Sequence, residues 1–235
     1  MTTKGILLMF KIRTLFFSLA MLMLVACAGN RGQSVSTQPK TLPNGSPAYD
    51  NAAIDSSYYM KQLAVLRADS LKAIESTDWL KFRKEFLKCR LSQPDRFNTT
   101  ALELVIKQAR KSGDSAEELK VSQELLDMDF TNISAHYTFV TTPSVDDNVK
   151  EFHKQVINGL LNSIRESGQG NSTETAMYVI NIGEEYDFIY LSGFRPLRQE
   201  LIEENGRHYD RLITDGGDGR KYQFYFDVTD FFGHY

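Results

Sequence analysis

The spacing of the apolar residues changes once along this chain, just after Gly168. Between residues 50 and 168 apolar residues recur every three or four positions, as on one face of a helix. After residue 172 they tend to alternate with polar residues, as in half-buried strands. This order is typical of an α+β chain. We predict a helical region over 49–168 and a small antiparallel β-sheet over 169–235, packed together as one globular unit, 49–235.

Two helix starts are predicted near the middle of the helical region. Thr100 with Glu103, and Ser115 with Glu118, have the spacing of a capping box, in which two side chains satisfy free amide groups at a helix start. Gly113 suits the left-handed conformation that ends many helices. These signals predict two short antiparallel helices joined at Gly113.

Four more helices are predicted around this hairpin. Apolar stripes cover Leu63–Ile74 and Trp79–Leu87, Asn132 can cap a brief helix through Val140, and the longest helix runs from about Val145 to Ser167. The segment Leu126–Tyr137 resembles the junction between two tetratricopeptide repeats, although no second copy follows at a period of about 34 residues. We therefore expect six helices in a tetratricopeptide-like array of hairpins.

Two turn signals organise the C-terminal region. Asn205-Gly206 is the strongest short hairpin signal, and Asp215–Gly219 consists of turn residues. They separate runs rich in β-branched and aromatic residues, and a further such run, Ala176–Ile182, lies upstream. We predict about four antiparallel strands, with a short helix over Glu185–Leu191.

The N-terminus has the three-part build of a secretory signal. Lys11 and Arg13 precede an uncharged apolar run over residues 14–25. This run is shorter than the roughly 20 residues that span a bilayer. Leu24–Cys27 resembles the lipobox of bacterial lipoproteins, in which the cysteine is acylated and becomes the first mature residue. We predict a cleaved signal peptide, 1–26, and a membrane anchor of lipid, including palmitate, on Cys27.

The residues after Cys27 bear on localisation. Residues 27–48 have too few apolar side chains to form a core, so we expect a flexible tether. Ala28 is not the aspartate that favours inner-membrane retention in enterobacterial lipoproteins, and no acidic cluster follows it. By these resemblances we expect the periplasmic face of the outer membrane. Translation from Met9 would give the signal peptide a more typical basic beginning than translation from Met1, so we expect Met9 to be the start.

Charge and cysteine content argue against a nucleic-acid-binding protein and against a protein stabilised by an intramolecular disulfide. The whole chain has 27 Lys and Arg and 30 Asp and Glu; removing Lys4, Lys11 and Arg13 with the signal leaves 24 basic residues and a formal charge of about −6. Such a chain is a poor nucleic-acid binder, because phosphate neutralisation supplies most of that affinity. Apart from Cys27, Cys89 is the one thiol, so no intramolecular disulfide is expected, and its apolar neighbours predict a core position.

No metal, cofactor or catalytic motif is recognisable. His136, His153, His208 and His234 form no pair at metal-ligand spacing, and HExxH, CxxC, EF-hand, phosphate-loop and G-x-S-x-G sequences are missing. We therefore assign no metal ligand, cofactor or catalytic residue.

One acidic cluster is a candidate site: Glu184, Glu185 and Asp187, together with Tyr186. Acids that follow a strand can supply general acid and base groups, but the first turn of a helix favours acids through its dipole. Eight aromatic residues near the C-terminus offer rings that can stack on sugars, although alternation in strands buries about half of them: Tyr209, Tyr222, Phe224, Tyr225, Phe226, Phe231, Phe232 and Tyr235.

Four segments resemble a family of uncharacterised Bacteroidetes proteins, domain of unknown function 4919. They are Thr175–Ile180, Gly183–Phe188, Gly206–Arg211 and Tyr225–Val228, and the resemblance covers about residues 60–232. It implies an exported protein with helices followed by a small sheet, and no known activity. The sequence departs from it at Gly168-Gln-Gly170, where an acidic residue is expected between the glycines.

Two functions remain open. The first is an envelope lipoprotein without enzymatic activity, anchored to lipid through Cys27, whose helical hairpins present a groove to another envelope protein or a peptide. The alternative is a periplasmic glycan-binding protein or hydrolase that uses Glu184, Glu185 and Asp187. An open cleft holding those acids would favour the alternative.

Overall fold

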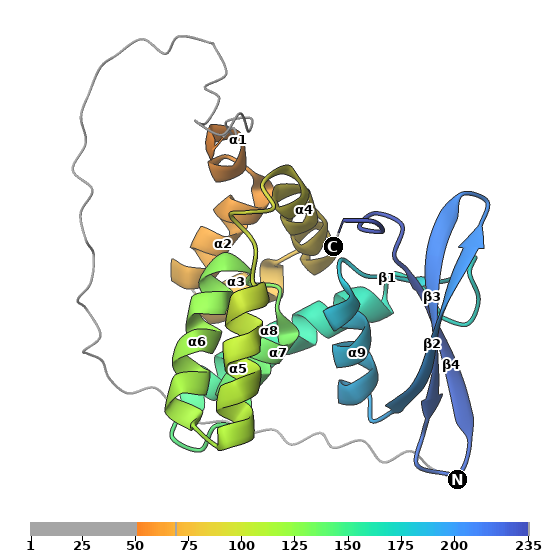
Figure 1. Ribbon diagram of the computed structural model, residues 1–235. Helices are drawn as coiled ribbons and strands as arrows, with labels where there is room; N and C mark the ends of the chain where they lie inside the picture. The colour runs from red at the N-terminus through yellow and green to blue at the C-terminus, as the bar shows by residue number, and fades with distance from the viewer. Residues whose placement is uncertain (1–50, 69, 235) are drawn as a thin grey trace.

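A computed structural model describes residues 51–68 and 70–234. The predicted signal peptide, tether and acylated Cys27 lie outside these residues. Within them no helix is long and apolar enough to cross a membrane. The fold mixes helices with a sheet, as predicted. Figure 1 shows the first eight helices on one side, the sheet on the other, and α9 (Ile182–Leu191) between them.

The helical half is built from eight helices among the described residues, two more than predicted. They are α1 (Asn51–Asp55), α2 (Tyr58–Ala68), α3 (Ser70–Ser76), α4 (Trp79–Ser92), α5 (Thr100–Ser112), α6 (Ser115–Met128), α7 (Ile133–Thr141) and α8 (Asp147–Arg165). The predicted stripe over Leu63–Ile74 is divided between α2 and α3. From α5 to α8 each helix packs on the next, and α8 also contacts α3 and α4. This makes α8 the central helix of the half.

The α5–α6 hairpin forms as predicted, but its caps differ. Gly113 adopts the left-handed conformation, with φ of 74°. The cap of α6 is Asp114, whose side chain accepts a hydrogen bond from the Glu117 amide at 3.1 Å. The capping box predicted at Ser115 is therefore wrong by one residue, because an aspartate stands one position earlier and caps equally well.

The box predicted at Thr100 and Glu103 is also wrong. The helix begins after Thr99, whose hydroxyl donates to the Glu103 carboxylate at 2.7 Å and caps no amide. The Thr100 amide donates instead to the Asn98 side chain at 3.1 Å. The prediction for the later helix is confirmed, since Asn132 accepts from the Ala135 amide at 2.8 Å.

The sheet has the order β1-β4-β3-β2. Its strands are β1 (Met177–Tyr178), β2 (Arg195–Glu204), β3 (Arg207–Asp215) and β4 (Lys221–Asp227). Strands β2, β3 and β4 form the predicted antiparallel meander, and both residues of the Asn205-Gly206 turn have positive φ, 52° and 73°. This pair matches the type I′ turn that such a hairpin favours.

The prediction of a wholly antiparallel sheet is wrong at β1, which runs parallel to β4. The predicted strand Ala176–Ile182 is reduced to two residues. Val179 and Ile180 are both fully buried, so the chain there no longer alternates between two faces, and Asn181 then caps α9. The helix consequently starts three residues earlier than predicted.

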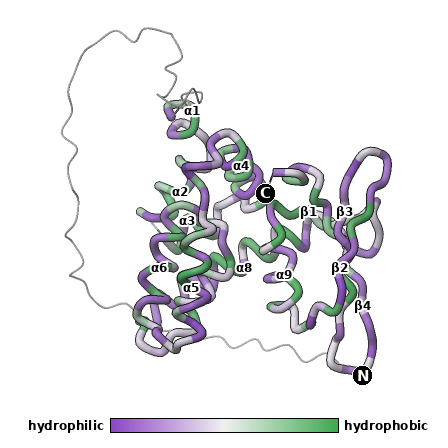
Figure 2. Tube along the Cα trace, viewed as in Figure 1, coloured by the Kyte–Doolittle hydropathy of each residue, from purple (hydrophilic) through white to green (hydrophobic). Residues whose placement is uncertain are grey.

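One hydrophobic core joins the two halves. It contains Phe82 and Leu160 from the helices, Phe188 from α9, and Leu212 and Phe226 from the sheet. In Figure 2 hydrophobic and hydrophilic stretches alternate along α4, α8 and the strands, as expected of elements with one buried face. The predicted core position of Cys89 is confirmed.

Candidate functional site

The predicted acidic cluster lies at the start of α9, where each side chain meets a different part of the molecule. Asn181 caps the helix by accepting a hydrogen bond from the Glu184 amide at 2.8 Å. The Glu184 side chain points into the helical half, where Arg83 of α4 binds both of its oxygens, at 2.8 and 2.5 Å. The Ile180 amide also donates to Glu184, at 2.9 Å.

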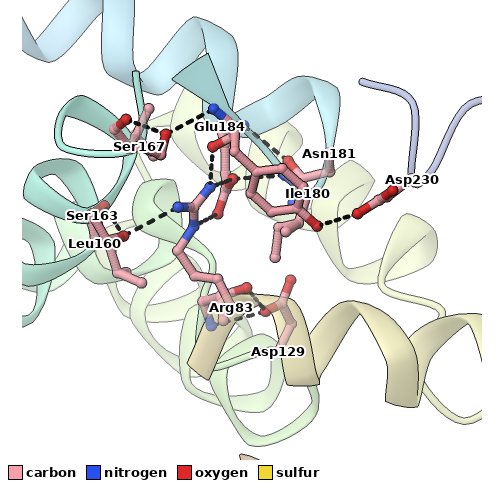
Figure 3. Close-up of polar contacts among 12 residues, drawn as sticks. Arg83, Asp129, Leu160, Ser163, Ser167, Ile180, Asn181, Glu184 and Asp230 are labelled. Carbon is pink, nitrogen blue, oxygen red and sulfur yellow. Dashed lines mark hydrogen bonds and ion pairs between the residues drawn. The ribbon is translucent and has the colours of Figure 1, made fainter. Parts of the chain in front are cut away.

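Arg83 completes a fully buried ion pair with Glu184. Its guanidinium is 0% exposed and also donates to the Ser163 hydroxyl at 3.1 Å and the Tyr178 carbonyl at 2.9 Å. Figure 3 shows Arg83 reaching from α4 between Glu184 and Ser163. One side chain thus ties together α4, α8, β1 and α9. Bidentate geometry with further hydrogen bonds is what a buried ion pair requires to offset desolvation.

Glu185 points the other way, into the sheet. It is 0% exposed and interacts with Asp210 of β3 and Gln199 of β2; the Gln199 amide donates to Asp210 at 2.5 Å. Burial first, and then the charge of Asp210, raise the pKa of Glu185 to about 9. Its Oε1 has no hydrogen-bond partner among the described residues. At neutral pH Glu185 is therefore protonated, and its proton is shared with Asp210 in a hydrogen bond.

The next two residues of α9 turn toward a groove. The Tyr186 hydroxyl donates to Gln199 at 2.8 Å. Asp187 is half-buried, and the amide of Ser134, at the start of α7, donates a hydrogen bond to its carboxylate. Burial, followed by the charge of Glu184, raises the pKa of Asp187 to about 7 despite the lowering effect of that amide. The structure therefore does not gather the predicted acids in one cleft, and only Tyr186 and Asp187 reach the groove.

This central groove has a volume of about 790 Å³. It lies along α5, where the ends of α4, α6, α7 and α9 meet the C-terminal segment. The buried part of its lining, the floor, is mainly apolar: Phe97, Ile106, Leu125, Ala135 and Phe231. The more exposed part, the rim, is mainly polar and includes Asn98, Glu103, Lys107, Arg110, Asn181 and Asp187. An apolar floor with a few polar groups around it is typical of ligand sites.

Asp129 is a buried acid of the groove that the sequence did not reveal. It lies in the turn between α6 and α7, where its Oδ1 accepts hydrogen bonds from both the amide and the hydroxyl of Thr131, at 2.8 and 2.5 Å. Burial raises its pKa to about 6 in spite of these bonds. In sequence, an aspartate two residues before a threonine reads as an ordinary turn, which is why it gave no signal.

Three cations line the same groove. The Arg90 guanidinium donates to the Ile180 carbonyl at 2.5 Å, and Arg110 pairs with Glu118 at 2.8 Å. Lys107 is exposed and makes no ion pair with another described residue. The rim therefore offers groups of both signs.

Two of the histidines meet in the core although they stand far apart in sequence. The Nδ1 atoms of His136 and His153 are 2.7 Å apart, and His136 Nε2–H donates to the Phe130 carbonyl at 3.0 Å. His153 Nδ1–H must then be the donor to an unprotonated His136 Nδ1. Burial lowers the pKa values to about 3 for His136 and about 4 for His153, so both rings are neutral and contribute stability that is lost as pH falls below about 6.5.

The remaining candidates are the possible metal ligands and the aromatic residues proposed to stack on sugars. Among the described residues no group of three or more His, Cys, Asp or Glu is placed to hold a metal ion. Of the aromatic candidates, Tyr209, Phe226 and Phe231 are buried, while Phe224 and Tyr222 pack on Phe194. Tyr235 lies outside the described residues. The described rings serve mainly in packing.

A family model, domain of unknown function DUF4919, matches residues 90–235, more than half of the chain. The chain belongs to this family. The match begins within α4 and covers the groove, α9 and the whole sheet, whereas Arg83 lies before its first residue. No curated protein and no solved structure matches the chain.

Proposed function

We propose that this member of the DUF4919 family is a non-enzymatic envelope lipoprotein that binds a peptide segment of another envelope protein in the central groove. The observation that carries the proposal is the groove itself. It combines an apolar floor with charged and amide groups on its rim, which suits an extended peptide with apolar and polar side chains. Successive helical hairpins, as in repeat-like domains, commonly present such grooves.

The hydrolase alternative loses support from the placement of the acids. A general acid and base pair must reach the same substrate bond. Glu184 is bound on both oxygens by Arg83, and Glu185 shares a proton with Asp210 inside the sheet interface. Neither lines the groove. The glycan-binding alternative loses most of its stacking rings. Tyr209, Phe226 and Phe231 are buried, and Tyr222, Phe224 and Phe232 pack on other rings of the fold.

The anchor and the location belong to the proposal. A lipid-modified Cys27 would hold the domain at the membrane, since two or more acyl chains anchor stably where one holds weakly. The periplasmic face of the outer membrane is the proposed location. The segment between Cys27 and α1 would set how far the groove stands from the bilayer.

The test is a pull-down of the intact lipoprotein from its own membranes after mild crosslinking, with mass spectrometry of bait and partners. A Cys27→Ser variant is the control for anchoring. We expect acyl chains on Cys27 in the wild type, loss of membrane association in the variant, and enrichment of one envelope protein whose crosslinks map to the groove rim at Lys107.

Three results would count against the proposal. A mature wild-type protein without lipid would remove the anchor. Enrichment of soluble glycan fragments with no protein partner would favour the sugar-binding alternative. Crosslinks to a partner from the outer face of the sheet alone, near Arg198 and Tyr225, would place the binding surface elsewhere.

A further inference from the structure

We infer that Asp187 selects a cationic group, an ammonium or guanidinium, on the segment that binds in the central groove. The inference rests on the proposed function and names the chemistry of its ligand. It is argued from the position of Asp187, from its hydrogen-bonding capacity, and from the contrast with the other acids around it.

Asp187, unlike Glu184 and Glu118, has no cation of its own. Glu184 is held by Arg83 on both oxygens, and Glu118 is paired with Arg110. Asp187 makes no ion pair with any described residue, although it lines a groove with three cations in its wall. A half-buried carboxylate without a counter-ion is unfavourable, because it loses hydration without gaining an ion pair. A cation bound in the groove would supply that ion pair.

The carboxylate also has unused acceptor capacity. The Ser134 amide supplies one hydrogen bond, and an ionised carboxylate offers about four lone-pair sites. Asp129, the more deeply buried acid of the groove, is 5% exposed and already accepts two bonds from Thr131. Asp187 is therefore the half-buried acid that a ligand can reach, whereas Glu103 lies exposed on the rim and accepts from the Thr99 hydroxyl.

The raised pKa of Asp187 agrees with this geometry. An opposite charge within about 4–6 Å normally favours the ionised form of a carboxyl group. Arg110 acts on Asp187 only as a minor favourable charge, and burial outweighs it. An ammonium group of the ligand beside Asp187 would lower the pKa of this carboxyl group and favour its ionised form.

The probes are bead-bound, N-acetylated peptide pools of four residues, with one position fixed as Lys, Arg, norleucine or Glu and the others mixed. Acetylation leaves the fixed side chain as the sole designed cation of the Lys and Arg pools. A fifth pool, with a free N-terminus and norleucine at the fixed position, tests an N-terminal amine as the source of the charge. Retention of the full mature protein in detergent is measured for each pool.

The variants separate charge from shape. Asp187→Asn keeps an oxygen that can accept from the Ser134 amide and removes the charge, Asp187→Glu keeps the charge, and Glu103→Gln removes a different acid from the same rim. We expect the wild type to favour at least one cationic pool over norleucine by about tenfold, as one ion pair in a partly buried site provides. Asp187→Asn should lose this preference, while the other two variants keep it.

The outcomes distinguish the role of Asp187 from the proposed function of the groove as a peptide site. Retention of norleucine pools as strongly as cationic ones by the wild type, or an unchanged preference in Asp187→Asn, would overturn the role of Asp187 and leave a peptide groove standing. Retention of no pool at all would overturn the peptide groove and this inference with it. Equal urea midpoints for wild type and Asp187→Asn show that the comparison concerns binding and not folding.

Discussion

Four consecutive side chains at the start of α9 connect four parts of the molecule. Glu184 binds Arg83 of α4, Glu185 meets Asp210 of β3, Tyr186 donates to Gln199 of β2, and Asp187 accepts from Ser134 of α7. The Glu-Glu-Tyr-Asp segment, which belongs to one of the four segments that resemble the family, therefore joins the helical half to the sheet. At the residue scale its acids are structural groups first, and Asp187 alone also faces the groove.

The protonated state of Glu185 leads to a pH prediction. Between pH 4.5 and about 9 the folded chain keeps a proton that the unfolded chain releases, because burial raises the pKa of Glu185 from 4.5 to about 9. Its contribution to stability is fully present below pH 4.5 and is lost as pH rises through 9. We expect Glu185→Gln to reduce the loss of unfolding free energy between pH 7 and 9, where one such group contributes at most about 1.4 kcal/mol per pH unit.

Urea unfolding at pH 6, 7, 8 and 9 measures this effect. Glu203→Gln changes an exposed glutamate of β2 and should leave the pH slope as in the wild type. Identical slopes for Glu185→Gln and wild type would mean that Glu185 is ionised in the folded protein.

At the scale of elements, the helix ends are specified by single cap residues. Aspartate caps α4, α6 and α8, and asparagine caps α7 and α9. In each case the side chain accepts a hydrogen bond from an amide of the first turn, which otherwise has no partner within the helix. These short bonds fix where each helix begins, and therefore which residues reach the groove.

The α6 cap offers a direct test, because the sequence pointed to Ser115 and the structure to Asp114. We expect Asp114→Ala to lower the free energy of unfolding by about 1 kcal/mol, the usual cost of a lost N-cap. Ser115→Ala should change it by less than about 0.5 kcal/mol, as for most surface substitutions. Thermal or urea unfolding of the two variants is the measurement. A larger loss for Ser115→Ala would restore the capping box.

At the scale of the whole molecule, the family match begins later in the chain than the hydrophobic core does. The match starts at residue 90, but the core continues into earlier helices through Tyr59, Leu66 and Phe82. Arg83, the partner of Glu184, also lies in that earlier part. Without it Glu184 becomes a buried carboxylate with no cation, which costs about 3–5 kcal/mol and is comparable to the total stability of many domains.

We therefore predict that residues 90–235 do not fold alone, whereas residues 51–235 do. Near-ultraviolet circular dichroism and the cooperativity of urea unfolding compare the two fragments. The longer fragment should show fixed aromatic signals and a single transition. A cooperative transition in the shorter fragment would show that the earlier helices are an addition to the family domain and not part of its core.

The sequence by itself determined the α+β class, most helix positions, the Gly113 helix end and the Asn205-Gly206 turn. These features depend on neighbours within a few residues, through periodicity, caps and backbone preference. The tertiary structure decided the partners of Glu184, Glu185 and Asp187, the parallel direction of β1, the meeting of His136 with His153, and the groove. Each of these depends on contacts between residues far apart in the chain, such as Arg83 with Glu184. The spacing of residues along the sequence does not specify which distant side chains will be buried next to each other.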